Sequence, residues 1–162
     1  TAMGGTPTLN SQNSITVTAT TTGPSGGTRG AQNIYWEEVG NKIKLKYNLG
    51  YTVGGSGGSG DYLFQLPSGV TFNTAANRNP VHTNAMFNPN AGEMAPYFIP
   101  AKGGVIYAGA WSNDIYIVPY NANTFRVVSS WNGNAGVLQP WSSGFFGLVQ
   151  NMMISLEFEI WK

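Results

Sequence analysis

A strict alternation of apolar and polar residues between Lys42 and Leu49 constrains the fold more than any other feature of the chain. Ile43, Leu45 and Tyr47 face one way, and three lysines face the other. A period of two residues is typical of a β-strand with one buried face and one solvated face. The same period returns near the end of the chain, where one face would carry Met152, Ile154, Leu156, Phe158 and Ile160. Both segments are therefore predicted to be half-buried strands.

Shorter runs with the same character predict about nine strands in all, with no credible helix pattern between them. The turn signals include Gly40-Asn41, Ser112–Asp114 and Asn121–Asn123, and Trp131–Gly136 is predicted to be a loop. Closely spaced strands without helical crossovers must pair in antiparallel fashion. The expected fold is an all-β, antiparallel sandwich or barrel.

The composition narrows the partners and the location. Charged residues make up 9% of the chain and the net charge is +1, whereas typical domains carry about 25% charged residues. The sequence has no basic patch of the kind that binds nucleic acid or an anionic membrane. No apolar run approaches the ~20 residues that span a bilayer. With no cysteine, disulfides and thiolate sites are excluded. We expect an extracellular or virion-surface protein, with residues 1–13 as a cloning scar and linker and residues 14–162 as one domain.

One part of the chain resembles a known family. Val39–Lys42 and an alternating strand are followed by a Gly-Ser loop, then by Asp61-Tyr62-Leu63-Phe64 and by Leu66–Phe72. This order is similar to the tumour-necrosis-factor-like and complement-head-like jelly rolls at the C-termini of viral and bacteriophage fibres and bacterial collagen-like surface proteins. The similarity covers roughly residues 31 to 162, and its most specific part is 61–72.

The resemblance implies a two-sheet jelly roll that forms a homotrimer, with the last strand near the threefold axis. The second face of that strand carries Met153, Glu157, Glu159 and Trp161, which we expect at the trimer interface. An ordinary exposed Trp at a chain end is the alternative. The two glutamates argue against this placement, because an axis would gather six carboxylates unless basic or amide groups compensate them.

Catalytic chemistry is nearly absent from the sequence. The single histidine, His82, lies in an irregular segment, and no nucleophile elbow accompanies it. Glu157 and Glu159 would lie roughly 6.5–7 Å apart on one strand, but glycosidases place their acids on different elements around a cleft. Gly54–Gly60 lacks the lysine of a phosphate-binding loop and is expected to be a flexible connection. We expect no enzyme activity, no metal and no cofactor.

Aromatic residues beside turns suggest a binding function instead. Trp111, Trp131 and Trp141 lie near predicted turns, with amides close by at Asn113, Asn132 and Asn134. Flat rings beside amides suit sugar recognition, although the rings could equally plug the ends of the core. The leading hypothesis is a receptor-binding head that recognises a cell-surface glycan or protein. A structural trimerisation or capsid-decoration domain, and a bacterial adhesin or carbohydrate-binding module, are the alternatives.

Overall fold

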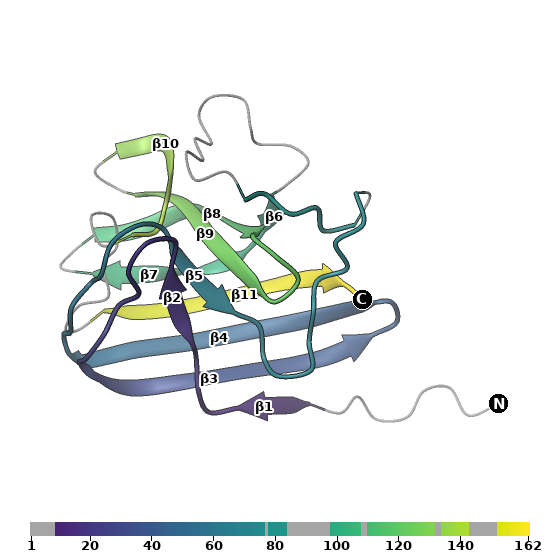
Figure 1. Ribbon diagram of the computed structural model, residues 1–162, viewed down its shortest axis with the longest axis horizontal. Helices are drawn as coiled ribbons and strands as arrows, with labels where there is room; N and C mark the ends of the chain where they lie inside the picture. The colour runs from purple at the N-terminus through teal and green to yellow at the C-terminus, as the bar shows by residue number, and fades with distance from the viewer. Residues whose placement is uncertain (1–8, 77, 84–97, 108–109, 132–133, 143–151) are drawn as a thin grey trace.

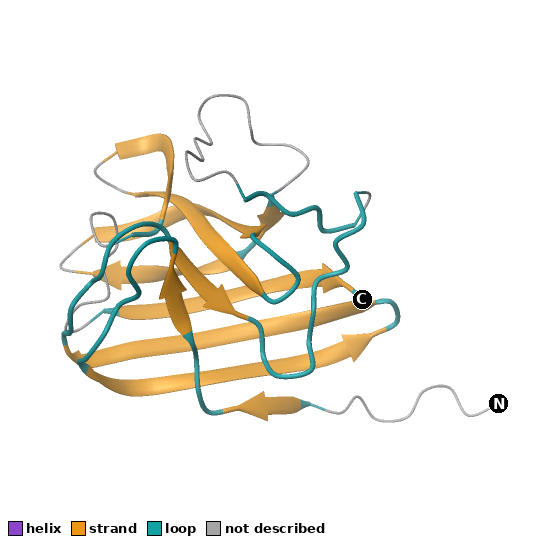
Figure 2. Ribbon diagram, in the orientation of Figure 1, coloured by secondary structure: helices purple, strands orange, loops and turns teal. Residues whose placement is uncertain are grey.

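The computed structural model describes residues 9–76, 78–83, 98–107, 110–131, 134–142 and 152–162. These residues form strands and connecting loops, and none of them is helical (Figure 2). No described segment is a helix of the length and hydropathy needed to cross a membrane. The prediction of an all-β fold is therefore confirmed.

The strands form two antiparallel sheets (Figure 1). The first sheet has the order β1-β3-β4-β11-β7, and the second has the order β2-β5-β9-β8, with β10 added on β9 and β6 on β8. The first sheet contains β1 (Asn10–Gln12), β3 (Thr28–Val39), β4 (Lys42–Val53), β11 (Met153–Trp161) and β7 (Lys102–Tyr107). The second contains β2 (Val17–Ala19), β5 (Tyr62–Gln65), β9 (Thr124–Trp131), β8 (Ala110–Pro119), β10 (Asn134–Pro140) and β6 (Ile99–Pro100).

The two strands with the clearest alternation, β4 and β11, lie side by side at the centre of the first sheet. Their register runs from Met153 opposite Gly50 to Trp161 opposite Lys42. The apolar residues of both strands are buried, and the alternate residues face outward. The Gly40-Asn41 turn between β3 and β4 is confirmed, with Gly40 at φ 63°.

The predicted turn at Ser112–Asp114 is wrong. These residues lie inside β8, which pairs first with β7 and then continues along β9. The register shifts between Asn113 and Tyr116, and Asp114 adopts a positive φ of 47°. A bulge of this kind bends a strand, and aspartate tolerates the left-handed region better than most residues. The turn-like residues therefore mark the bend where β8 passes from one sheet to the other.

The core between the sheets is centred on Phe125 of β9. Its ring lies 5.5 Å from the ring of Tyr47 and 5.3 Å from that of Phe158, both in the first sheet. It also lies 5.8 Å from the ring of Phe64 and 6.2 Å from that of Phe72. These spacings are favourable for aromatic pairs, so one side chain connects the two layers. As predicted, Tyr47 is a core residue, and Trp36 is partly buried against the same core.

The Gly-Ser segment at 54–60 is bound along its length. Ser59 exchanges two backbone hydrogen bonds with Thr22, and Ser56 exchanges two with Ser25, so every third residue is bonded. A Cβ atom on Gly58 would lie 2.1 Å from the Thr22 carbonyl oxygen, and one on Gly55 would lie 2.4 Å from that of Ser25. Glycine is thus needed for two backbones to meet closely. The expectation of a merely flexible connection is corrected.

Residues at the start of the described chain also belong to the fold. Asn10, Ser11 and Gln12 form β1, which pairs with Trp36, Tyr35 and Ile34 of β3. This strand lies within the segment that we expected to be a linker.

Candidate functional site

The carboxyl end of β11 extends past its neighbour β7. The pairing of these strands runs from Met153 opposite Ile106 to Glu157 opposite Lys102 and ends there. The backbone then leaves the first sheet, because Ile99 and Pro100 pair with β8. Glu159 and Trp161 therefore lie beyond the last rung of β7, beside a gap between β11 and β6.

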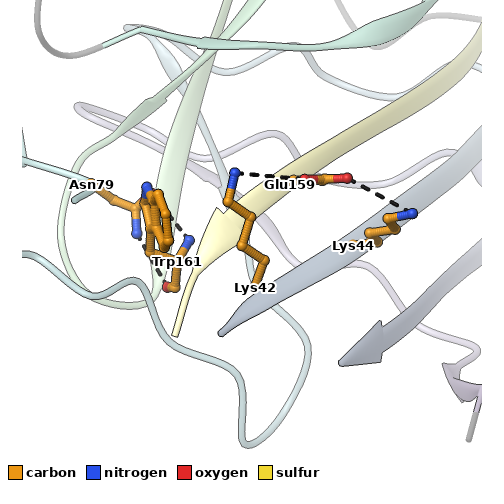
Figure 3. A network of polar contacts seen from close by, with 5 residues as sticks. All are labelled: Lys42, Lys44, Asn79, Glu159 and Trp161. Atoms are coloured by element: carbon orange, nitrogen blue, oxygen red, sulfur yellow. Dashed lines mark hydrogen bonds and ion pairs between the residues drawn. The ribbon is translucent and has the colours of Figure 1, made fainter. Parts of the chain in front are cut away.

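A loop side chain closes the far end of this gap. Asn79, which is 2% exposed, directs its amide at the backbone of Trp161 (Figure 3). Asn79 Nδ2 donates to the Trp161 carbonyl at 3.2 Å, and Asn79 Oδ1 accepts from the Trp161 amide at 3.4 Å. The Asn79 side chain, together with the Asn73 N–H that donates to the same carbonyl at 3.4 Å, thus takes the place of a neighbouring strand at the edge of β11.

Between these two ends lies a groove of about 580 Å³. We call it the β11 groove. Its walls come from β4, β6, β7, β11 and the loop that contains Arg78 and Asn79. The lining residues are Lys42, Lys44, Arg78, Asn79, Phe98, Ile99, Pro100, Ala101, Lys102, Glu157, Phe158, Glu159, Ile160 and Trp161.

The charges of the β11 groove are unequal. Among the described residues, four cationic side chains line it, from Lys42, Lys44, Arg78 and Lys102, against two carboxylates from Glu157 and Glu159. Glu159 lies 3.9 Å from Lys42 Nζ and 3.8 Å from Lys44 Nζ (Figure 3). These pairs are long and half-exposed, so each contributes little to stability. In the part of the chain that the structure describes, Arg78 and Lys102 form no ion pair.

The side chains of Lys42 and Arg78 place positive charge over the indole ring of Trp161. Lys42 Nζ lies 4.4 Å from the centre of its ring, and Arg78 Cζ lies 4.3 Å from it. Both distances suit attraction between a cation and the ring quadrupole. The indole, the amide cap and the two cations together fix the shape of this end of the groove.

The residues predicted to bind a ligand are only partly placed. The backbones of Asn113, Trp131 and Asn134 come together at one end of β8, β9 and β10, where Asn113 faces Ser130 and Trp131 faces both Ser112 and Asn134. Trp111 precedes Ser112 in β8, and its backbone lies opposite Ile106 of β7. Asn132 lies outside the described residues. The predicted loop at Trp131–Gly136 is only partly correct, because Asn134 begins β10.

Trp141 occupies a different position from the one expected. It is fully buried, and its indole Nε1 donates to Ser129 Oγ at 2.8 Å. Its ring lies 6.1 Å from that of Phe64 in the main core. Trp141 is therefore a core residue, which corrects the expectation of a surface contact and agrees with the alternative of a core plug.

The residues predicted at a trimer interface divide into two groups along β11. Met153 is 63% exposed at one end of the strand. Glu157, Glu159 and Trp161 lie at the other end and line the β11 groove. Each glutamate has lysine neighbours within the chain: Glu157 lies in register between Lys46 and Lys102, and Glu159 pairs with Lys42 and Lys44. The repulsion that six glutamates would cause at a trimer axis is therefore reduced by lysines of the same protomer.

The described residues contain no group of three or more His, Cys, Asp and Glu side chains that could hold a metal ion. Asp61 is engaged by Arg126, whose Nε lies 3.0 Å from Asp61 Oδ2. The same guanidinium donates from Nη1 to the backbone carbonyl of His82 at 3.1 Å. Burial is the largest influence on the pKa of Arg126 and lowers it, while the Asp61 carboxylate opposes that change. Arg126 of β9 thus connects Asp61, the residue before β5, to the loop at 79–83.

Three polar members of the β11 groove were not singled out in the sequence: Arg78, Asn79 and Lys102. Arg78 and Asn79 belong to the irregular segment that also contains His82. The one local signal is Asn79-Pro80, which is typical of a turn and does not indicate a partner.

No family model, curated protein or solved structure is significantly similar to this chain.

Proposed function

We propose that this chain is a non-enzymatic receptor-binding head of a viral or phage fibre, and that the β11 groove contacts the cell-surface glycan or protein that it recognises. The single observation behind the proposal is an open groove whose walls are fixed by Asn79, Trp161 and the cations over its ring. A preformed cleft with a few placed polar groups is the usual form of a ligand site.

The proposed architecture is a jelly roll that assembles as a homotrimer. The central position of β11 between β4 and β7 supports it, because the resemblance implies a C-terminal strand near a threefold axis. We place the self-association surface at the Met153 end of β11. At ~3.3 Å per residue, Trp161 lies roughly 26 Å further along the strand, so the β11 groove would stay open in the trimer.

Several identical heads would multiply a weak contact into useful avidity. The direct test is binding of the purified chain to candidate host cells and to an array of glycans, with Trp161→Ala and the exposed Val53→Ala as a matched pair. We expect loss of binding for the first variant only. Binding to no cell and no glycan would favour the structural alternative, a trimerisation or decoration domain without a ligand.

Assembly is tested separately by light scattering. The proposed trimer should give about three times the chain mass of 17.3 kDa, and Met153→Glu should shift it toward one chain mass. A clean monomer at micromolar concentration would contradict the proposed trimer.

A further inference from the structure

The Arg78 side chain is preorganised for an oxyanion. Its guanidinium carbon lies 4.3 Å from the centre of the Trp161 ring, and within the described chain it forms no ion pair. A guanidinium held over a ring keeps its N–H donors at its own edge, where they match a carboxylate or sulfate in a two-pronged geometry.

The neighbouring charges favour the same class of ligand. Lys42 also lies over the Trp161 ring, at 4.4 Å, and Lys44 and Lys102 line the same groove. Lys42 and Lys44 share a single carboxylate, that of Glu159. The described part of the β11 groove therefore presents a net positive surface, which favours an anion over a cation.

The strand backbone adds hydrogen-bonding groups. Tyr51 N–H donates to the Met152 carbonyl and Lys162 N–H to the Asn41 carbonyl, each at 3.0 Å. Even-numbered residues of β11 thus turn their backbone groups toward β4, and odd-numbered residues turn theirs the other way. Glu159 lies between the last rung of β7 and the Asn79 cap, so its N–H and C=O point toward the groove.

The opposite wall is mostly apolar. It is formed by Ile99, Pro100 and Ala101, and proline has no backbone N–H to offer Glu159. A ligand for this site should combine an anionic group, hydroxyls for the strand backbone and a C–H face for the apolar wall. A sugar ring that carries an acid group has all three.

We propose that the β11 groove binds an anionic saccharide, with the acid group on Arg78 and Lys42 and the sugar ring between Glu159 and the wall at 99–101. This inference rests on the proposed receptor-binding function and specifies its ligand class. Glu159 forms ion pairs with Lys42 and Lys44. It therefore competes with the bound anion for these two lysines and lowers the affinity.

The test is an NMR titration of the whole chain with glucuronate, glucose 6-sulfate and, as the neutral match, glucose. We expect both anions to shift the Trp161 indole and Glu159 amide signals in a saturable way. The anion that binds more tightly would show whether the site prefers a carboxylate or a sulfate. Glucose should leave them unchanged. Added salt should weaken the anion effect, since the charges are partly exposed.

Three variants complete the experiment. Arg78→Gln should lower the affinity for the anion at least tenfold, Glu159→Gln should raise it several-fold, and Lys46→Gln, on the same face outside the groove, should leave it unchanged. Thermal melts would check that each variant is folded. No shift with either anion, or the same shift in Arg78→Gln as in the parent chain, would overturn the anionic-saccharide inference. Continued cell binding by the chain in that case would leave the receptor function standing.

Discussion

Asn79 bonds both backbone groups of Trp161, through Nδ2 to the carbonyl at 3.2 Å and through Oδ1 to the amide at 3.4 Å. The contact joins residues 82 positions apart, and it also fixes the loop, since Asn79 Nδ2 lies 3.2 Å from the Asn73 carbonyl. The buried amide of Asn79 therefore helps to hold the loop against the end of β11 that lines the groove.

Asn79→Ala should destabilise the protein by about 1–3 kcal/mol, because it removes the acceptor of the Trp161 N–H and one of the two donors to the Trp161 carbonyl, which Asn73 N–H also reaches at 3.4 Å. Urea unfolding would measure the change. Thr74→Ala, in an exposed part of the same loop, is the control and should stay within about 0.5 kcal/mol of the parent. Equal stability of the two variants would show that the amide cap is dispensable.

Phe125→Ala should cost about 3–5 kcal/mol, because the ring is fully buried and touches aromatic residues from both sheets. Val53→Ala, at a site that is 52% exposed, should have little effect. Chemical unfolding of both variants tests whether Phe125 connects the layers. A cost near 1 kcal/mol would contradict that role.

Gly58→Ala should be clearly more destabilising than Gly26→Ala. The two glycines have similar φ values of 66° and 69°, so the penalty for a left-handed alanine is the same in both. Only at Gly58 would the new Cβ meet backbone, at 2.1 Å from the Thr22 oxygen, whereas nothing lies within 4 Å at Gly26. The difference in melting temperature isolates the close contact, and equal melting temperatures would show that the two segments separate easily.

Tyr47→Phe should reduce the loss of stability at alkaline pH. Burial raises the pKa of Tyr47 well above its ordinary value of 10.0, so the folded chain keeps the phenol proton when the unfolded chain releases it. This stabilising contribution is complete below pH 10 and is lost as the pH rises above it. Near pH 7 the variant should be about 1 kcal/mol less stable, because Tyr47 Oη donates to the Gln65 carbonyl at 2.8 Å.

Unfolding free energies measured from pH 8 to pH 11 would test this. The curves of the parent and the variant should converge above pH 10. Parallel curves throughout would contradict a raised pKa in the folded state.

The period-two strands β4 and β11 were predictable from sequence, because burial on one face of a sheet imposes alternation directly. The bend in β8 was not, since Ser112, Asn113 and Asp114 suit a turn and a bulge equally well. Trp141 was misplaced for a related reason: proximity to a predicted turn does not show whether a ring points into the core or into solvent.

The β11 groove was beyond prediction from local patterns. It requires the loop at 78–79 to meet β11 at residue 161, and it requires β7 to leave the sheet at Lys102. Both depend on the tertiary path of the chain.

The passage of β8 from one layer to the other has a consequence for how such domains behave when crowded. The strands follow one hydrogen-bonded path whose ends, in the part of the chain described, are β1 and β2, each only three residues long. At these two ends, the short strands give an approaching chain little template for edge-to-edge pairing. Copies displayed close together should therefore not join through these two terminal strands, although few charges keep them apart.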